Sequence, residues 1–421
     1  MVKVITYGTY DLLHYGHRRL LERAKALGDY LIVGVTADSF DKSRGKINVQ
    51  QSLMERIEGV RATGLADEII IEEYEGQKID DIRRYGVDIF TVGSDWVGKF
   101  DYLEEYCKVV YLPRTEGVSS SQVRSDKRKI TMRIVEDKGI GAKIAHESNY
   151  VNGVEVLSPE STDTEDAIYL LSMPDKHYDL IKTALNEGKH VLCESPITMQ
   201  EAQCKELLNM AKDKNLVLLD AIKTAYGTAY NRLLLLVKSG AIGKVISVDA
   251  TCTSLMRNYD SKNLKGVWSS ITAWGPTALL PVFQILGTEY TDKFIASQYI
   301  DDEKKFDGFT KIDFVYHGAV ASVKIAKAAK SEGSMVITGT KGYIYVPSPW
   351  WKTDYFEVKY EDQNKNKRFF YQLEGEGIRY ELVAFSKAIE SGINNSYVSE
   401  DISVAIAKVM EDWAAKKVRE I

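Results

Sequence analysis

Short apolar runs alternate with amphipathic stretches in the first part of the chain. Buried strands are predicted where apolar and β-branched residues follow one another without a break, at Val2–Tyr7, Tyr30–Val35, Glu68–Ile71, Ile89–Val92 and Val109–Leu112. Between the first two runs, leucine and alanine recur at helical spacing, which predicts a helix over about Tyr15–Leu27. Strands that alternate with helices are typical of a parallel sheet covered on both faces.

A second alternating pattern follows the charged stretch Arg124–Lys129, which we interpret as a solvated linker. It predicts strands at Arg133–Val135, Ala167–Ser172, His190–Cys193 and Val217–Asp220, and helices at His177–Glu187 and Gln200–Asp213. Only a few residues separate the run that ends at Leu157 from the run that begins at Asp166. An ordinary Rossmann fold places a helix and more chain there, so one βα unit is predicted to be missing.

From about Lys244 the apolar runs lengthen and alternate with polar residues, which predicts an antiparallel sheet with one covered face. Two helices are predicted after it, near Tyr380–Ser391 and Ser399–Lys416. The patterns together predict an α/β protein. Its domains are a Rossmann-like parallel-sheet domain at 1–128, a truncated Rossmann-like domain at 129–228, and an α+β antiparallel-sheet domain at 229–421.

The composition is that of a soluble globular protein, with 44% hydrophobic and 27% charged residues in 421. A net charge of −5 argues against a broad nucleic-acid surface. The cysteines Cys107, Cys193, Cys204 and Cys252 form no CxxC pair, which favours reduced thiols in a cytoplasmic protein over a zinc site or a disulfide framework. We find no signal peptide and no apolar run long enough for a membrane span.

The strongest chemical signal is the segment GTYDLLHYGH, Gly8–His17. A glycine turn follows the first strand, and His14 and His17 stand at the predicted start of the helix. A helix N-terminus presents unpaired N–H groups that suit a phosphate, and Gly16 lets phosphate oxygens approach the backbone. Imidazoles on adjacent turns can both donate to one phosphate chain. The alternative is a pair of ordinary hydrogen-bonded histidines.

A second segment, RTEGVSSSQVR over Arg114–Arg124, also suits an anion. Arg114 offers a planar, permanent charge to a phosphate or a base. Ser119–Ser121 resemble a capping run that opens a helix, which would form a second anion site. Plain capping without a ligand is the alternative for these serines.

Together the two segments resemble the HxGH and RTEG motifs of the cytidylyltransferases. With LLERAKALGDYLIVGVTAD and VGSDWVGKFDYL, they make about the first 126 residues similar to the glycerol-3-phosphate cytidylyltransferase family. The resemblance implies in-line transfer of CMP from CTP to a small phosphorylated alcohol, with release of pyrophosphate and with Mg²⁺ bridging the phosphates. No metal-ligating residues are assigned.

The resemblance also implies which residues form the site. The residues expected to act on the phosphates are His14, His17, Lys46 and Arg114. The residues expected around the nucleotide are Thr9, Tyr10, Asp11, Gly16, Gly93, Asp95, Thr115, Gly117, Ser119 and Ser120. Arg44, Arg61 and Tyr74 are expected at the acceptor, with Arg61 compensating for a family arginine that is replaced here by Gly64. A solvated basic loop is the alternative for Arg44 and Lys46.

The segment GKHVLCESPITM, Gly188–Met199, resembles a motif of the Gfo/Idh/MocA oxidoreductases, and the similarity extends over roughly residues 130–421. Ser195 stands where that family has a lysine, and Glu136 and Lys138 stand where phosphate-facing glycines are expected. We therefore predict that this half does not use NAD(P) and is retained for packing, oligomerisation or substrate presentation. An altered reductase in which Lys223 replaces the lost lysine is the alternative.

Three single residues and one tryptophan pair in this half are also of interest. Lys223 and His177 are interpreted as structural or surface residues. Trp274 and the pair Trp350–Trp351 are interpreted as core or interface packing, with a ligand groove as the alternative.

Three functions remain open on the sequence: a CTP-dependent cytidylyltransferase with an inert partner domain, a bifunctional enzyme whose second half reduces a keto- or aldo-phosphate with NAD(P)H, and a nucleotide-binding scaffold without turnover. The favoured acceptor is glycerol 3-phosphate, with ribitol 5-phosphate, another polyol phosphate or a phosphonate as alternatives. By analogy the product would feed cell-wall or capsule polymers. Because both resembled families form homo-oligomers, we expect a homo-oligomer that binds neither nucleic acid nor membrane.

Overall fold

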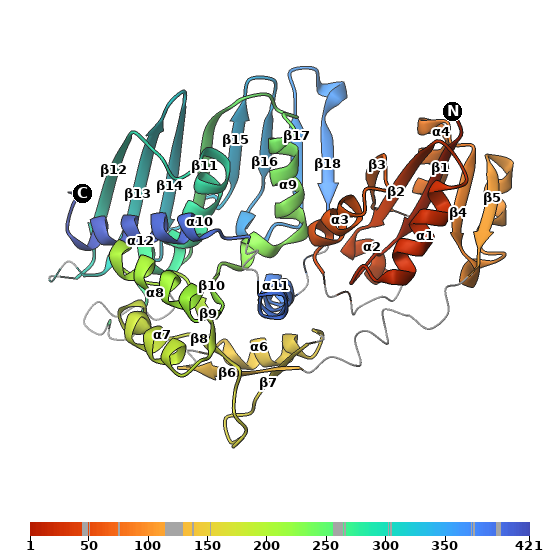
Figure 1. Cartoon of the computed structure of the whole chain (residues 1–421). Coiled ribbons are helices and arrows are strands. Elements are labelled where there is room, and N and C mark those ends of the chain that lie inside the picture. Colours follow the sequence, from red (N-terminus) through yellow and green to blue (C-terminus); the bar gives the residue numbers. More distant parts are fainter. Residues whose placement is uncertain are drawn as a thin grey trace. The chain divides into compact units, whose positions relative to one another are not determined.

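The computed structural model describes the chain except for residues 44–48, 50, 75, 114–128, 137–138, 152, 256–263, 265–266, 302, 304, 372, 374 and 393–396. The chain forms two compact units, residues 1–129 with 150–153, and residues 130–149 with 154–421 (Figure 1). The predicted boundary between the second and third domains lies inside the second unit and stays a prediction. Among the helices described, none is long and apolar enough to cross a membrane.

The first unit is built on a parallel sheet, sheet A, in the order β3-β2-β1-β4-β5. Its elements are β1 (Lys3–Gly8), α1 (Tyr15–Lys25), β2 (Tyr30–Thr36), α2 (Asp38–Ser43), α3 (Leu53–Ala62), β3 (Glu68–Glu72), α4 (Gln77–Tyr85), β4 (Ile89–Gly93), η1 (Ser94–Trp96), η2 (Asp101–Glu105) and β5 (Lys108–Leu112). Leu21 of α1 and Ile57 of α3 pack on one face, and Ile82 of α4 packs on the other. The predicted parallel sheet with two covered faces is confirmed.

The order of sheet A reverses between β1 and β4, because β2 and β3 lie on one side of β1 and β4 and β5 lie on the other. In open parallel sheets, ligands bind in the crevice at the carboxyl ends of the strands where such a reversal occurs. The segment Gly8–His17 leaves the carboxyl end of β1 at this point and enters α1. The fold therefore brings the strongest sequence motif to the place where a ligand is expected.

The second unit begins with another parallel sheet, sheet B, in the order β10-β9-β8-β6-β7. Its elements are β6 (Ile130–Val135), α6 (Gly141–Ser148), β7 (Val154–Val156), β8 (Ala167–Leu170), η3 (Pro174–Lys176), α7 (His177–Asn186), β9 (His190–Glu194), α8 (Glu201–Asp213) and β10 (Leu218–Ala221). After the edge strand β7 the chain passes to β8 on the far side of β6, with no helix or strand in the described residues 157–166. The predicted loss of one βα unit is confirmed.

The remainder of the second unit is built on a larger sheet, sheet C, in the order β18-β17-β16-β15-β11-β14-β13-β12-β19. Its strands are β11 (Val245–Thr253), β12 (Asp292–Tyr299), β13 (Asp307–Tyr316), β14 (Ala319–Ala326), β15 (Met335–Gly339), β16 (Tyr343–Val346), β17 (Tyr355–Lys359), β18 (Lys367–Phe370) and β19 (Arg419–Glu420). The prediction of an antiparallel sheet needs one correction, because β11 pairs parallel with β14 and β12 pairs parallel with β19. Alternation of apolar and polar residues reports a covered face but not the direction of the neighbouring strand.

Helices cover one face of sheet C through apolar residues such as Leu233, Leu279 and Ile406. The helices and short turns of this region are η4 (Lys223–Tyr226), α9 (Thr228–Lys238), α10 (Ser270–Leu286), η5 (Trp350–Lys352), η6 (Gln363–Lys365), η7 (Gly375–Gly377), α11 (Ile378–Ser391) and α12 (Glu400–Ala414). The last two were predicted, whereas α9 and α10 were not. In α10 the signal is hidden because Pro276 and Pro281 lie inside it and its buried residues surround the helix.

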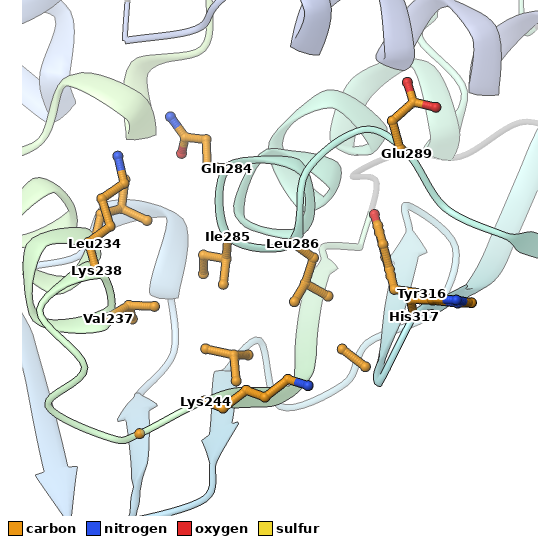
Figure 2. A pocket seen from close by; sticks show the side chains of 13 residues that line it. Leu234, Val237, Lys238, Lys244, Gln284, Ile285, Leu286, Glu289, Tyr316 and His317 are labelled. Carbon is orange, nitrogen blue, oxygen red and sulfur yellow. The ribbon is translucent and has the colours of Figure 1, made fainter.

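A cavity of about 470 Å³ opens between the ends of α9 and α10 and the turn that joins β13 to β14. Figure 2 shows its apolar residues, among them Val237, Ile285 and Leu286, with Lys244 and His317 also on the lining. This cavity is lined by none of the residues predicted to bind or act on a ligand, and we assign it no function.

Replacing Gly34 of β2 by alanine is expected to destabilise the first unit. An added Cβ would lie 2.2 Å from the Tyr7 ring, which is buried and whose hydroxyl donates to Asp81 Oδ2 at 2.8 Å. Overpacking of this kind costs roughly 1–3 kcal/mol. The measurement is the free energy of unfolding from urea-dependent hydrogen exchange in peptides of β1 and β2. As a control, Gly59→Ala in α3 meets only Leu13 at 3.7 Å and should stabilise the unit by about 0.4–1 kcal/mol.

Candidate active site

The loop between β1 and α1 is held in a strained conformation. Tyr10 and Leu12 have φ of 52° and 50°, which residues with a side chain rarely adopt. Gln51 secures the loop from two sides: its main-chain N–H donates to Asp11 Oδ1 at 2.9 Å, and its Oε1 accepts from the Leu12 N–H at 2.6 Å. The neighbouring segment therefore fixes the path of the motif before the helix begins.

A buried arginine, Arg56 of α3, ties this loop to the carboxyl end of sheet A. Its Nη1 donates to the main-chain oxygens of Thr9 at 2.7 Å and Thr36 at 2.8 Å. Its Nε donates to the Gln51 oxygen at 3.1 Å, and its Nη2 forms an ion pair with Asp38. The side chain has no exposed surface. Arg56 thus joins the ends of β1 and β2 to the start of α2.

Sequence reasoning missed Arg56. The available signal was a charged residue among Leu53, Ile57 and Val60, which form the buried face of α3. A charge at such a position is tolerated only when it is paired and fully hydrogen-bonded. The pattern therefore indicated a buried partner, although it could not say which one.

The two motif histidines lie against each other at the start of α1. His14 is the N-cap, and its Nδ1 accepts from the Gly16 N–H at 3.1 Å, so the proton of the neutral ring lies on Nε2. The His17 ring stacks on it with centroids 3.9 Å apart and an angle of 20°. Tyr10, which is buried, meets the His17 ring edge-on at 5.6 Å. The predicted pair is therefore brought together at a helix N-terminus, which suits a phosphate chain.

A small cavity of about 50 Å³ lies beside the loop, at the ends of β1 to β4. Its lining residues are Tyr7, Gly8, Thr9, Thr36, Glu72, Lys78, Phe90, Val92, Trp96 and Phe100. The ammonium of Lys78 forms an ion pair with Glu72 and lies 4.7 Å from the centre of the Tyr7 ring. Sequence reasoning missed this buried cation, because Lys78 lies on α4 and belongs to neither motif.

Four other predicted residues lie at the carboxyl end of β1 or β4 or in the helix that follows that strand. Gly93 ends β4, and the exposed Asp95 follows it on η1. Thr9 follows β1, and its hydroxyl donates to Asp41 Oδ1 at 2.9 Å. Gly16 is the second residue of α1. These positions are those expected of a nucleotide site at the β1–β4 reversal.

Two residues predicted at the acceptor have local partners. Arg61 lies in the last turn of α3, is largely exposed, and forms an ion pair with Glu58. The Tyr74 hydroxyl donates to Asp80 Oδ2 at 2.8 Å, and partial burial with this carboxylate raises the pKa of Tyr74 to about 12. Their roles at the acceptor stay predictions.

Several predicted residues lie outside the described part of the chain. They are Arg44, Lys46, Arg114, Thr115, Gly117, Ser119 and Ser120, together with most of the predicted linker. Their roles also stay predictions.

In the second unit, the structural interpretation of His177 is confirmed. Its buried ring nitrogens lie 2.8 Å and 2.9 Å from the main-chain oxygens of Pro196 and Ser172. Trp350 is also core, with its indole N–H donating to the Thr251 oxygen at 3.0 Å. Trp274 and Lys223, in contrast, line a cavity. Core packing is therefore an incomplete description of Trp274.

The first βα turn of the second unit carries an acidic residue. Glu136 follows β6 with φ of 54°, and its carboxylate accepts from Lys176 Nζ at 3.0 Å. In Rossmann folds this turn cradles the pyrophosphate of a dinucleotide, which a carboxylate repels. The described residues of this turn therefore do not fit a pyrophosphate in the usual position.

The comparisons with known proteins agree with the geometry of the first unit. Residues 5–126 match the family model described as cytidylyltransferase-like. A glycerol-3-phosphate cytidylyltransferase from Bacillus spizizenii is 50% identical over 131 residues, which cover 30% of this chain and 97% of the relative. The chain belongs to the cytidylyltransferase family. It is a nucleotidyltransferase enzyme.

This cytidylyltransferase carries a second unit that is similar to oxidoreductases. Residues 127–221 match the model described as oxidoreductase family, NAD-binding Rossmann fold. A trans-1,2-dihydrobenzene-1,2-diol dehydrogenase from Xenopus laevis is 27% identical over 263 residues, covering 59% of this chain and 77% of the relative. A 3-ketoreductase from Actinomadura kijaniata, solved with NADP, shares the fold with a TM-score of 0.58, 16% identity, and coverage of 70% and 99%. These relatives give no support to the prediction that the unit does without NAD(P).

Replacing Arg56 by methionine is expected to destabilise the first unit by about 3–5 kcal/mol, because the buried Asp38 and Asp41 would lose their cation. The measurement is again the urea dependence of hydrogen exchange in β1 and β2. Arg61→Met, on the same helix but exposed, should have little effect. If the two substitutions lowered the free energy of unfolding equally, the buried ion pairs of Arg56 would stabilise the unit no more than the exposed ion pair of Arg61.

Proposed function

We propose that the first unit transfers CMP from CTP to glycerol 3-phosphate, forming CDP-glycerol and pyrophosphate. The observation that supports this most directly is the stacked His14–His17 pair at the N-terminus of α1, beside the strand reversal of sheet A. The 50% sequence identity to a glycerol-3-phosphate cytidylyltransferase supports glycerol 3-phosphate as the acceptor. By analogy with such products, CDP-glycerol would serve the synthesis of cell-surface polymers.

The reaction proceeds by in-line displacement at the α-phosphorus of CTP. A phosphate oxygen of the acceptor forms the new P–O bond while the bond to the pyrophosphate leaving group breaks. The Nε2–H of His14 and the ring of His17 donate hydrogen bonds to the phosphate oxygens as charge develops on them. The main-chain N–H groups at the start of α1 also stabilise this developing charge.

The chain itself positions the groups and supplies positive charge. Arg56 holds the loop that carries the motif, so the histidines need not reorganise during the reaction. We assign Lys78 to the acceptor side, because its ammonium lies in the cavity at the strand ends. CTP arrives as its Mg²⁺ complex, in which the ion neutralises charge on the phosphates. Arg44, Lys46 and Arg114 would complete the site.

A bifunctional enzyme is the second candidate function. The match of residues 127–221 to an oxidoreductase family favours this candidate. In such an enzyme the second unit would reduce a keto- or aldo-phosphate, and the first unit would transfer CMP to the resulting alcohol. The Glu136 carboxylate in the first βα turn argues against dinucleotide binding in the usual mode. Titration of the whole chain with NADPH, followed by nucleotide fluorescence, separates this candidate from an inert partner unit.

Glycerol 3-phosphate is expected to be the preferred acceptor. Pyrophosphate release should be measured with the whole chain, CTP and Mg²⁺, and with glycerol 3-phosphate, ribitol 5-phosphate or a phosphonate in turn. We expect kcat/KM to be about tenfold or more higher for glycerol 3-phosphate, because a pocket built for one polyol binds others imperfectly. If pyrophosphate were released only with ribitol 5-phosphate, that compound would be the acceptor instead. If pyrophosphate were released with none of the three compounds, the result would favour a scaffold that binds nucleotide without turnover.

Replacing His17 by alanine is expected to lower kcat/KM by roughly 10²–10³, the usual effect of losing a donor to a developing oxyanion. The matched control is Tyr15→Phe, because Tyr15 lies between the two histidines but is 62% exposed. Steady-state pyrophosphate release compares the two variants with the unmodified chain. Near-normal turnover of His17→Ala would exclude this histidine from the chemistry.

A further inference from the structure

The small cavity at the carboxyl ends of β1 to β4 holds charges of both signs. Its volume is about 50 Å³, which is room for a few water molecules and therefore for one end of a small molecule. Lys78 of α4 and Glu72, the last residue of β3, both line it. A site built for a phosphate alone would hold positive charge and no carboxylate, so this ion pair indicates a different kind of ligand group.

Glu72 is fixed in the cavity by the neighbouring strand. Its side chain is 1% exposed, and its Oε2 accepts from the hydroxyl of Thr36, the last residue of β2, at 2.7 Å. Its Oε1 accepts from the Lys78 ammonium. The two oxygens of a carboxylate offer about four acceptor sites, so a carboxylate that accepts from a threonine and a lysine can accept from a ligand hydroxyl as well.

The ammonium of Lys78 has donors to offer a ligand. Its side chain is 10% exposed, and within the described part of the chain its one hydrogen-bond partner is Glu72. Its other close neighbours are the rings of Tyr7 and Phe100, whose centres lie 4.7 Å and 5.4 Å from Nζ. Ring faces attract a cation without taking the place of an oxygen acceptor. Because an ammonium carries three donors, Lys78 can donate to oxygen atoms of a bound molecule.

Aromatic rings provide the apolar side of the same cavity. Phe90, Trp96 and Phe100 line it. The ring centroids of Phe90 and Phe100 are 5.2 Å apart, and those of Trp96 and Phe100 are 5.8 Å apart. The carbon chain of a small alcohol can pack on these rings while its hydroxyl groups reach the ion pair.

The ion pair suits neutral hydroxyl groups better than a phosphate. Lys78 and Glu72 together carry no net charge, so they attract a phosphate weakly, and the carboxylate repels a phosphate at close range. A hydroxyl group both donates and accepts, so it can bridge an ammonium and a carboxylate. In the proposed reaction the phosphate of the acceptor lies instead toward the stacked histidines at the start of α1.

We propose that Lys78 and Glu72 bind the hydroxyl end of the acceptor, Lys78 as the donor and Glu72 as the hydrogen-bond acceptor, and that they thereby select a polyol phosphate over an alkyl phosphate of equal length. The inference rests on the CMP transfer proposed for the first unit. Glu72 becomes a specificity-determining residue, and Thr36 is the residue that positions it.

The test compares glycerol 3-phosphate with propyl phosphate, which has the same carbon chain and phosphate but no hydroxyl groups. Pyrophosphate release by the whole chain with CTP and Mg²⁺ gives kcat/KM for each compound. A site built to hydrogen-bond hydroxyl groups rejects an analogue that lacks them, so the unmodified chain should prefer glycerol 3-phosphate by at least about 10².

Variants assign this preference to the ion pair. Lys78→Met should lower the preference at least about tenfold, because one donor to the hydroxyl groups is lost. The double variant Glu72→Met with Lys78→Met should lower it further, to below about tenfold in total. The double variant leaves no unpaired buried charge, so it keeps the test available if Lys78→Met does not fold. Arg83→Met removes an exposed cation from the same helix and should change the preference less than about twofold.

Three outcomes would contradict the proposal. If Lys78 bound the phosphate, Lys78→Met would lower kcat/KM for both compounds by the same factor and leave the preference unchanged. An unchanged preference in a double variant that is folded by circular dichroism would mean that the ion pair only joins β3 to α4. An effect of Arg83→Met equal to that of Lys78→Met would remove the assignment to the cavity. If the unmodified chain releases no pyrophosphate with glycerol 3-phosphate, the proposed function itself fails, and this inference fails with it.

Discussion

The candidate active site depends on one buried charge, the guanidinium of Arg56. Burial of an arginine away from water raises the free energy of the folded state unless each of its N–H donors has a partner. Here the partners lie on the chain segments that must be brought together. Main-chain oxygens of Thr9 and Thr36 and the carboxylate of Asp38 all converge on it. The same bonds that stabilise the charge therefore set the ends of β1 and β2 and the path of the motif.

The loop that Arg56 holds stores backbone strain at Tyr10 and Leu12. Strained conformations of this kind persist only where surrounding contacts outweigh their cost. Their effect is to begin α1 with His14 as its cap, so that one ring nitrogen is engaged by the helix and the proton lies on the other. The two imidazole rings are thereby placed together at the start of α1 by contacts within the chain.

The second unit has the fold of oxidoreductases, but the described residues of its first βα turn do not fit a pyrophosphate in the usual position. Glu136 stands in that turn, and the described residues between β7 and β8 contain no helix or strand. The same unit contains a cavity lined by Lys223 and Glu194, whose charged groups lie 3.8 Å apart.

The sequence by itself determined the strands of sheet A and sheet B, the missing βα unit and the motif histidines, because each is a local pattern of neighbouring residues. It could not reveal α10, whose prolines hide the helical signal, or the parallel pairing of β11 with β14. Only the tertiary structure decided the partners of Arg56 and the joining of Tyr169, Glu194 and Glu381. Hydrogen bonds and ion pairs between distant segments leave no periodic trace in the chain, because their partners are far apart in the sequence.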